Sequence, residues 1–248
     1  MKSKIFIIVV AAFFLSITAI PSFADTLLYD DFDDGDLDTA WNVSYINASG
    51  WTYEESGTEL TVTDIVPIND FEWAGVRLTQ TIDPLADFIV DFNFSWDSEE
   101  SLTAMQKISL SLLNEKNYII ASVGYRDDRV GAGGGEVASA GKNYIWTGYD
   151  TLPLSGLASA NITRHDGNID ILWDDVNILS GTADSLLCSV AIEFWYYPYS
   201  NGSIFSTFGT ESVDLVSDPP SSPVPEPIAI ILLGIGLLGI FASRKIYS

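Results

Sequence analysis

The sequence predicts an all-β protein: a single antiparallel sandwich, flanked by an N-terminal signal peptide and a C-terminal transmembrane helix. Three observations favour the sandwich. Apolar and polar residues alternate with a period of two along several segments, turn residues separate these segments, and no long segment after the N-terminus has a helical period. About 200 residues lie between the two ends, which is enough for one sandwich domain with a full core.

The first 24 residues predict a secretory signal peptide. Lys2 and Lys4 form a basic start, and residues 5–20 are almost wholly apolar. Residues 22–24 then place small side chains at the −3 and −1 positions that signal peptidase requires. We therefore expect cleavage by signal peptidase after Ala24, and an uncleaved N-terminal anchor is the alternative.

The charge of the central segment limits its partners. Between Asp25 and Val224 there are 33 acidic residues and 7 Lys and Arg, which gives a net charge of −26. Such a segment repels nucleic acid and anionic lipid, so nucleic-acid binding is excluded. The same acidity favours divalent cations, particularly Ca²⁺, which prefers clustered oxygen ligands.

The strand pattern is clearest at residues 88–97. Every second side chain there is apolar, and the positions between are mostly polar; the apolar set is Phe88, Val90, Phe92, Phe94 and Trp96. The same alternation recurs at 108–112, 169–173 and 186–194. We therefore predict half-buried strands in these segments, with Trp96 and Trp173 in the core.

Two local features add detail to the predicted core. Asp166-Gly167 lies between two strand-like segments and is a strong hairpin signal, which places His165 at a surface hairpin position. The only cysteine, Cys188, allows no intramolecular disulfide and no thiolate zinc site. We expect it to be a small buried hydrophobe on the same strand face as four apolar residues, Leu186, Val190, Ile192 and Phe194.

The start of the domain carries a more specific signature. Residues 29–38, Tyr-Asp-Asp-Phe-Asp-Asp-Gly-Asp-Leu-Asp, precede Trp41, and Gly-Thr-Glu-Leu-Thr-Val follows at 57–62. This order resembles the opening of bacterial concanavalin A-like lectin/glucanase domains, and residues 211–216 suit that family's last strand. The resemblance implies a jelly roll of two curved sheets over residues 25–217.

A calcium site is one expectation from the acidic start. An EF-hand is excluded, because Phe32 and Trp41 fall where such a loop needs ligands. The resemblance instead implies a structural Ca²⁺ between the first and last strands, with Asp31 and Asp214 as ligands. The alternative is a solvated acidic turn, and no other cofactor is expected.

Catalysis is not expected. Retaining glycosidases use two carboxyl groups about 5 Å apart. The laminarinase-like branch of the family takes them from one strand with the pattern Glu-x-Asp-x-x-Glu, and this sequence has no such run. His165 is too isolated for a catalytic triad or a histidine metal site.

Exposed aromatic rings are the candidate binding residues. We interpret Gly131 to about Tyr144 as a long glycine-containing connection, and in 195–197 (Trp-Tyr-Tyr) strand alternation must expose at least one ring. Because exposed rings stack on sugar faces, we predict a glycan-binding patch of Tyr144, Trp146, Tyr149 and Trp195. Ordinary packing over the rim of the sandwich is the alternative.

The C-terminus has three ordered parts. Residues 218–227 form a proline-rich linker that ends in Pro225-Glu226-Pro227, residues 228–243 are uncharged and apolar, and residues 244–248 begin with Arg244-Lys245. As a helix, 228–243 would rise about 24 Å, slightly less than the hydrocarbon core. The basic pair, acting as a membrane stop, would lie on the cytoplasmic side, with the sandwich outside.

These three parts resemble the PEP-CTERM protein-sorting family. The resemblance implies recognition by an exosortase, a membrane enzyme expected to cleave near the Pro-Glu-Pro motif. We therefore expect an exported protein of a Gram-negative inner membrane that is processed to the cell surface or extracellular matrix, binds exopolysaccharide and is not an enzyme. A divergent carbohydrate-active enzyme, a matrix protein without ligand and an unprocessed single-span anchor are the alternatives.

Overall fold

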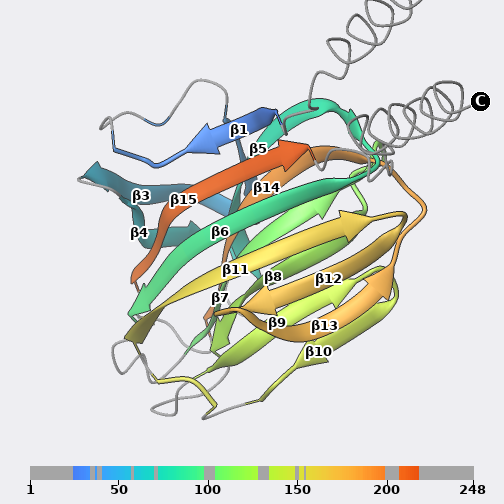
Figure 1. Cartoon of the computed structure of the whole chain (residues 1–248). Coiled ribbons are helices and arrows are strands. Elements are labelled where there is room, and N and C mark those ends of the chain that lie inside the picture. Colours follow the sequence, from blue (N-terminus) through green and yellow to red (C-terminus); the bar gives the residue numbers. More distant parts are fainter. Residues whose placement is uncertain are drawn as a thin grey trace, which may run out of the picture. The chain divides into compact units, whose positions relative to one another are not determined.

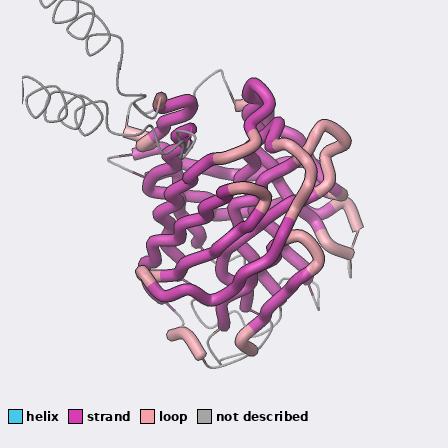
Figure 2. The backbone as a smooth tube through the Cα atoms, turned by 45° about the vertical axis from the view of Figure 1, so that its right-hand side comes forward, coloured by secondary structure: helices cyan, strands magenta, loops and turns pink. Residues whose placement is uncertain are grey.

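The computed structural model describes the central part of the chain, and all its regular elements there are strands (Figure 2). The described ranges are 25–33, 37, 41–56, 59–69, 72–97, 104–127, 134–148, 151–153, 155–198 and 207–217. They belong to one compact unit, Ala24–Asp218. Within these ranges no helix is long and apolar enough to cross a membrane. The predicted signal peptide (1–24), linker (218–227), transmembrane helix (228–243) and tail (244–248) lie outside them.

Two antiparallel sheets form the sandwich (Figure 1). The eight-stranded sheet has the order β13 (Val176–Thr182), β12 (Asn168–Trp173), β11 (Ser155–His165), β6 (Phe88–Asp97), β15 (Thr207–Ser217), β4 (Glu59–Pro67) and β3 (Ala48–Ser56), and β1 (Thr26–Asp30) also pairs with β15. The seven-stranded sheet has the order β10 (Asn143–Trp146), β9 (Gly135–Ala140), β8 (Ile119–Asp127), β7 (Ala104–Leu113), β14 (Leu187–Pro198), β5 (Ala74–Leu85) and β2 (Asn42–Ile46). The predicted antiparallel sandwich is confirmed.

Alternate residues of β6 build the middle of the core. The inward set predicted from the sequence is buried, from Phe88 to Trp96. Trp96 stacks on Tyr125 of the opposite sheet with ring centroids 4.6 Å apart, and its Nε1 donates a hydrogen bond to the carbonyl oxygen of Pro153 at 3.0 Å. Trp173 packs edge-on against Phe94. The prediction that Trp96 and Trp173 belong to the core is confirmed.

The predicted hairpin at Asp166-Gly167 joins β11 to β12. Asp166 and Gly167 have φ angles of 48° and 78°, the left-handed values that a tight two-residue hairpin requires at both positions. The amide of Asp166 donates a hydrogen bond to Oδ1 of Asp87 at 2.9 Å. His165 lies directly before this turn and is partly exposed, as predicted.

The prediction for Cys188 is wrong. The register of β14 against β5 shifts between Leu187 and Ser189, where Cys188 alone lies opposite residues 82–84, so the bulge is on β5 and the pairing of β14 is irregular at Cys188. At this irregularity Leu187 is buried in the core with 0% exposure, whereas Leu186 is 43% exposed and Cys188 is partly exposed. Beyond the bulge, Val190, Ile192 and Phe194 are buried as expected.

The long connection predicted from Gly131 to Tyr144 contains a strand. Residues 135–140 form β9, which pairs with β8 and, through the turn at Gly141, with β10. Small side chains fill this segment, so no alternation of large apolar and polar residues marks it as a strand. Tyr144 and Trp146 consequently lie on a strand rather than in a loop.

Candidate functional site

The outer face of the seven-stranded sheet, which points away from the core, carries most of the predicted binding residues. Directly paired residues of antiparallel strands point to the same side, so the register defines rows that cross the sheet. The central row, from β10 to β2, is Trp146, Val137, Gly124, Ser109, Glu193, Arg77 and Ser44. On one side of it lie Tyr144, Ser139, Ser122, Ser111, Ala191, Thr79 and Asn42, and on the other lie Gly135, Arg126, Lys107, Trp195, Gly75 and Ile46.

A buried ion pair occupies the middle of this face. Glu193 is only 2% exposed. Nε of Arg77 donates a hydrogen bond to its Oε1 at 2.7 Å, and the hydroxyl of Ser111 donates to Oε2 at 2.7 Å. Charge-assisted bonds of this kind are stronger than neutral ones. The carboxylate is therefore held in one orientation by both neighbouring strands, β5 and β7.

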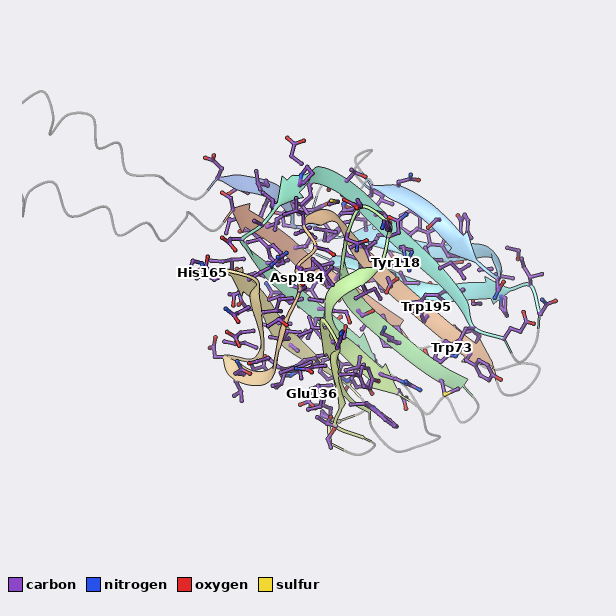
Figure 3. The ribbon with its side chains drawn as sticks, turned by 90° about the vertical axis from the view of Figure 1, so that its right-hand side faces the viewer. Trp73, Tyr118, Glu136, His165, Asp184 and Trp195 are labelled. Atoms are coloured by element: carbon purple, nitrogen blue, oxygen red, sulfur yellow. The ribbon has the colours of Figure 1, made fainter. Side chains whose placement is uncertain are left out.

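Aromatic rings gather beside the ion pair. The ring of Trp195 lies against Gly75, where an added Cβ would come within 2.7 Å of it. Trp73, which precedes β5, packs edge-on against Trp195 with centroids 6.3 Å apart and is tilted against Tyr197 at 5.5 Å. Figure 3 shows Trp73 and Trp195 together, far from His165. The absence of a side chain at Gly75 thus lets the ring of Trp195 pack closely against the backbone of β5.

The guanidinium group of Arg126 contacts two aromatic rings, Trp73 before β5 and Trp146 on β10. Its guanidinium carbon lies 6.0 Å from the ring centroid of Trp73 and 5.1 Å from that of Trp146, distances at which a cation is attracted by an aromatic face. A hollow of about 380 Å³ opens at this point and is lined by Trp73, Lys107, Arg126 and Trp195. It therefore combines aromatic faces with cationic hydrogen-bond donors.

Lys107 is a cation of the hollow whose surroundings disfavour its charged form. Burial lowers its pKa below the usual range, Arg126 and Arg77 act in the same direction, and Glu193 opposes them. Among the described residues, Lys107 makes no ion pair or side-chain hydrogen bond. Its ammonium group therefore has no acceptor among the described side chains and is a candidate donor to a ligand in the hollow.

Three of the four predicted glycan-binding residues lie on this face. Trp146 and Trp195 flank Arg126 and Lys107, and Tyr144 projects from the neighbouring row with 59% of its surface exposed. Tyr149 lies outside the described residues. Trp73, Lys107, Arg126, Arg77 and Glu193 were not predicted. Their sequence signal was weak, since only the pairing of β5, β7, β8 and β14 brings them together.

The outer-face rows carry one acidic side chain, Glu193. Glycoside hydrolysis by the usual mechanism needs two carboxyl groups. The carboxylate of Glu193 is bound by Arg77 and Ser111, so both of its oxygens are already engaged in contacts within the sheet. These rows therefore supply no catalytic pair, and the expectation that the protein is not an enzyme stays a prediction.

The predicted calcium ligands lie on either side of Tyr29. The hydroxyl of Tyr29 donates to Oδ2 of Asp31 at 3.1 Å, and Tyr29 is paired with Asp214 across β1 and β15. Nearby, Asp30 accepts hydrogen bonds from the amide of Phe32 at 2.9 Å and from Nε1 of Trp41 at 2.6 Å, so part of the acidic cluster orders the chain itself.

The described ranges contain no group of three or more His, Cys, Asp or Glu that could hold a metal ion. Calcium usually takes six to eight oxygen ligands. Oδ1 of Asp214 is buried without a hydrogen-bond partner, which is consistent with a missing ligand, but the described residues do not by themselves form the site. Calcium binding by Asp31 and Asp214 stays a prediction.

The Asp214→Asn variant should be more stable than the wild type near neutral pH. Burial, and then the charge of Asp91, raise the pKa of Asp214. Protonated Asp214 contributes its full stabilisation of the fold below its unfolded-state pKa. This contribution is lost as the pH rises through the raised pKa of the folded state. Because the group stays partly exposed, we expect a gain of about 0.5–1 kcal/mol. Thermal unfolding with a chelator at pH 7 and at pH 3 measures it. A gain that persists at the lower pH would contradict the electrostatic cause.

Solved structures of low sequence identity share the fold. A laminarinase from Flavobacterium sp. UMI-01 has a TM-score of 0.53 and 11% identity, covering 78% of this chain and 100% of that one. The catalytic domain of an endo-1,3-beta-glucanase (laminarinase) from Thermotoga petrophila RKU-1 has a TM-score of 0.55 and 10% identity, covering 79% and 98%. The Emp47p carbohydrate recognition domain has a TM-score of 0.52 and 10% identity, covering 81% and 100%. The predicted concanavalin A-like fold is confirmed.

The sequence comparison concerns the C-terminus. No significant match was found among curated proteins. Residues 223–245 match the family model of the PEP-CTERM protein-sorting motif. This range includes Pro225-Glu226-Pro227, the apolar segment and Arg244-Lys245, the parts on which the resemblance was based. The chain therefore consists of a concanavalin A-like sandwich followed by a PEP-CTERM protein-sorting motif.

Proposed function

We propose that the protein is an exported, non-enzymatic surface or matrix protein that binds polysaccharide on the outer face of its seven-stranded sheet. The observation that carries the proposal is the hollow between Trp73, Lys107, Arg126 and Trp195. The similarity to laminarinases and to a carbohydrate recognition domain supports it through the fold alone.

The chemistry of the hollow suits a sugar ring. The C–H groups of a pyranose ring pack against aromatic faces, and its hydroxyls accept hydrogen bonds from cationic donors. Trp195 is fixed by Gly75 and Trp73, so little conformational entropy is lost when a ring stacks on it.

The C-terminal motif supports the location. A PEP-CTERM motif implies export and membrane-associated sorting. In the proposed route, signal peptidase removes residues 1–24, residues 228–243 halt in the inner membrane of a Gram-negative cell, and Arg244 and Lys245 stay on the cytoplasmic side. An exosortase then cleaves near Pro225-Glu226-Pro227 and releases the sandwich to the cell surface or extracellular matrix.

The Trp195→Ala variant should bind polysaccharide about 30-fold more weakly than the wild type, a loss of roughly 2 kcal/mol for a central aromatic contact. Trp146→Ala should weaken binding less, because Trp146 does not line the hollow itself and only contacts Arg126, which does. A glycan array followed by titration of the best ligand measures both. Trp51→Ala is the matched control, since Trp51 is a half-buried tryptophan of the eight-stranded sheet.

The two alternative functions, a divergent carbohydrate-active enzyme and a matrix protein without ligand, predict different results in the same experiment. Release of sugar from a polysaccharide would contradict the non-enzymatic proposal and favour a divergent carbohydrate-active enzyme. Retention of binding by Trp195→Ala would contradict the assigned face. If the folded wild type binds no polysaccharide, a structural matrix role without ligand replaces the proposal.

A further inference from the structure

The basic residues of the sandwich are concentrated on the outer face. Between residues 25 and 217 the chain has 32 acidic and only 7 basic residues, and three of these seven, Arg77, Lys107 and Arg126, lie in two adjacent rows of this face. This face therefore carries a net positive charge, whereas the domain as a whole is strongly negative.

Two of these cations face one another across neighbouring strands. Lys107 of β7 and Arg126 of β8 are directly paired, and both line the hollow. Like charges at directly opposed positions of a sheet destabilise it. The single carboxylate of the rows, Glu193, is bound by Arg77 and Ser111. An anion placed between Lys107 and Arg126 would be attracted by both cations.

The aromatic rings place this cationic pair beside a stacking surface. Lys107 is paired with Trp195 on its other side, and Arg126 lies over Trp73 and Trp146. A sugar that stacks on Trp195 therefore brings its ring substituents within reach of Lys107. Guanidinium and ammonium groups together suit an oxyanion, because both donate charge-assisted hydrogen bonds.

We propose that the ligand is an anionic polysaccharide, whose ring carboxylate or sulfate is held between Lys107 and Arg126 while the ring stacks on Trp195. This inference rests on the proposed function and specifies its ligand class. The strongly acidic remainder of the domain repels a polyanion, so binding is confined to this face.

Binding of charged polymers and of their neutral counterparts to the full chain tests the inference. The protein is kept in a non-ionic detergent with a chelator. Polygalacturonate is compared with its carboxyl-reduced form, and dextran sulfate with dextran, by titration at 0.15 M salt. We expect at least one anionic polymer to bind about tenfold or more tightly than its neutral partner, and Lys107→Gln to remove about tenfold of that affinity. The pair that shows the difference identifies carboxylate or sulfate as the anion.

The control variants separate a local site from general charge. Lys116→Gln makes the same charge change in the exposed turn after β7 and should leave binding unchanged. Lys107→Arg keeps the charge and should retain most of the affinity. Arg126→Gln provides a second removal of charge at the site, and unfolding temperatures show whether each variant is folded.

The pH dependence supplies an independent readout. Lys107 is flanked by Arg126 on β8, by Glu193 on β14 and by Arg77 on β5, and burial lowers its pKa in the free protein. A bound oxyanion favours the charged form and raises that pKa, so binding takes up a proton and strengthens as pH falls. Above about pH 5, where ligand carboxylates stay ionised, we expect this trend in the wild type and its absence in Lys107→Arg.

Distinct outcomes overturn the inference and the proposed function. Equal affinity for charged and neutral polymers, with loss in Trp195→Ala, would overturn the anionic ligand and leave polysaccharide binding in place. Equal weakening by Lys107→Gln and Lys116→Gln would also overturn it, because general charge would then explain the binding. Absence of binding to every polymer by folded protein would overturn both.

Discussion

Replacing Glu193 with Ala should lower the free energy of unfolding by about 2–4 kcal/mol. Removing one partner of a buried ion pair typically costs 3–5 kcal/mol, and the lower range reflects the partial exposure of Arg77, which water can reach. The hydroxyl of Ser111 would lose its acceptor as well. Denaturant titration of the variant and the wild type measures the difference.

Two companion variants show what the loss means. Glu193→Gln keeps the shape and the hydrogen-bonding oxygen, so we expect it to lose about half as much stability. The double variant with Arg77→Ala should be less unstable than the sum of the single changes, because the cation is no longer left unpaired. A cost below about 1 kcal/mol for Glu193→Ala would contradict a structural role of the pair.

Replacing Pro225, Glu226 and Pro227 together with Ala should abolish C-terminal processing. The motif is proposed to be presented to an exosortase next to the apolar segment, and a proline-rich linker is stiff and keeps its backbone groups accessible. In the native host we expect wild-type protein that ends near residue 227, and variant protein that ends at Ser248 and stays with the membrane. Intact-mass measurement of membrane and medium fractions distinguishes the two forms.

A matched variant separates the motif from the linker. Replacing Pro219, Pro220 and Pro223 with Ala changes the same linker outside the Pro-Glu-Pro sequence and should leave processing intact. Wild-type protein with its C-terminus at Ser248 in every fraction would contradict processing and favour a permanent single-span anchor.

Most of the sandwich could be predicted from local patterns. Residues 88–97 alternate so regularly that burial of Phe88, Val90, Phe92, Phe94 and Trp96 followed from the sequence. Asp166-Gly167 identified its hairpin because both residues tolerate positive φ. Two predictions were wrong where the pattern is interrupted or weak. The irregular pairing of β14 with β5 at Cys188 interrupts the alternation, and the small side chains of β9 give no alternation of size.

The candidate site could be predicted only in part. Trp146 and Trp195 were chosen because strand alternation or a loop exposes aromatic rings, and both lie on the outer face. Lys107, Arg126 and Trp73 gave no local signal. The residues with which they form the hollow are 19 or more positions away in the sequence, and lone basic residues are ordinarily solvated surface groups.

The sequence by itself determined the strand content, the acidic charge, the core face of β6 and the C-terminal sorting motif. Each of these depends on spacing or composition within one short segment, which the sequence states directly. Only the tertiary structure decided which strands are neighbours, and hence that Arg126, Lys107 and Trp195 share one row beside the pair of Glu193 and Arg77. Strand order and register depend on long-range pairing, and a shift of one residue would turn each of these side chains to the opposite face.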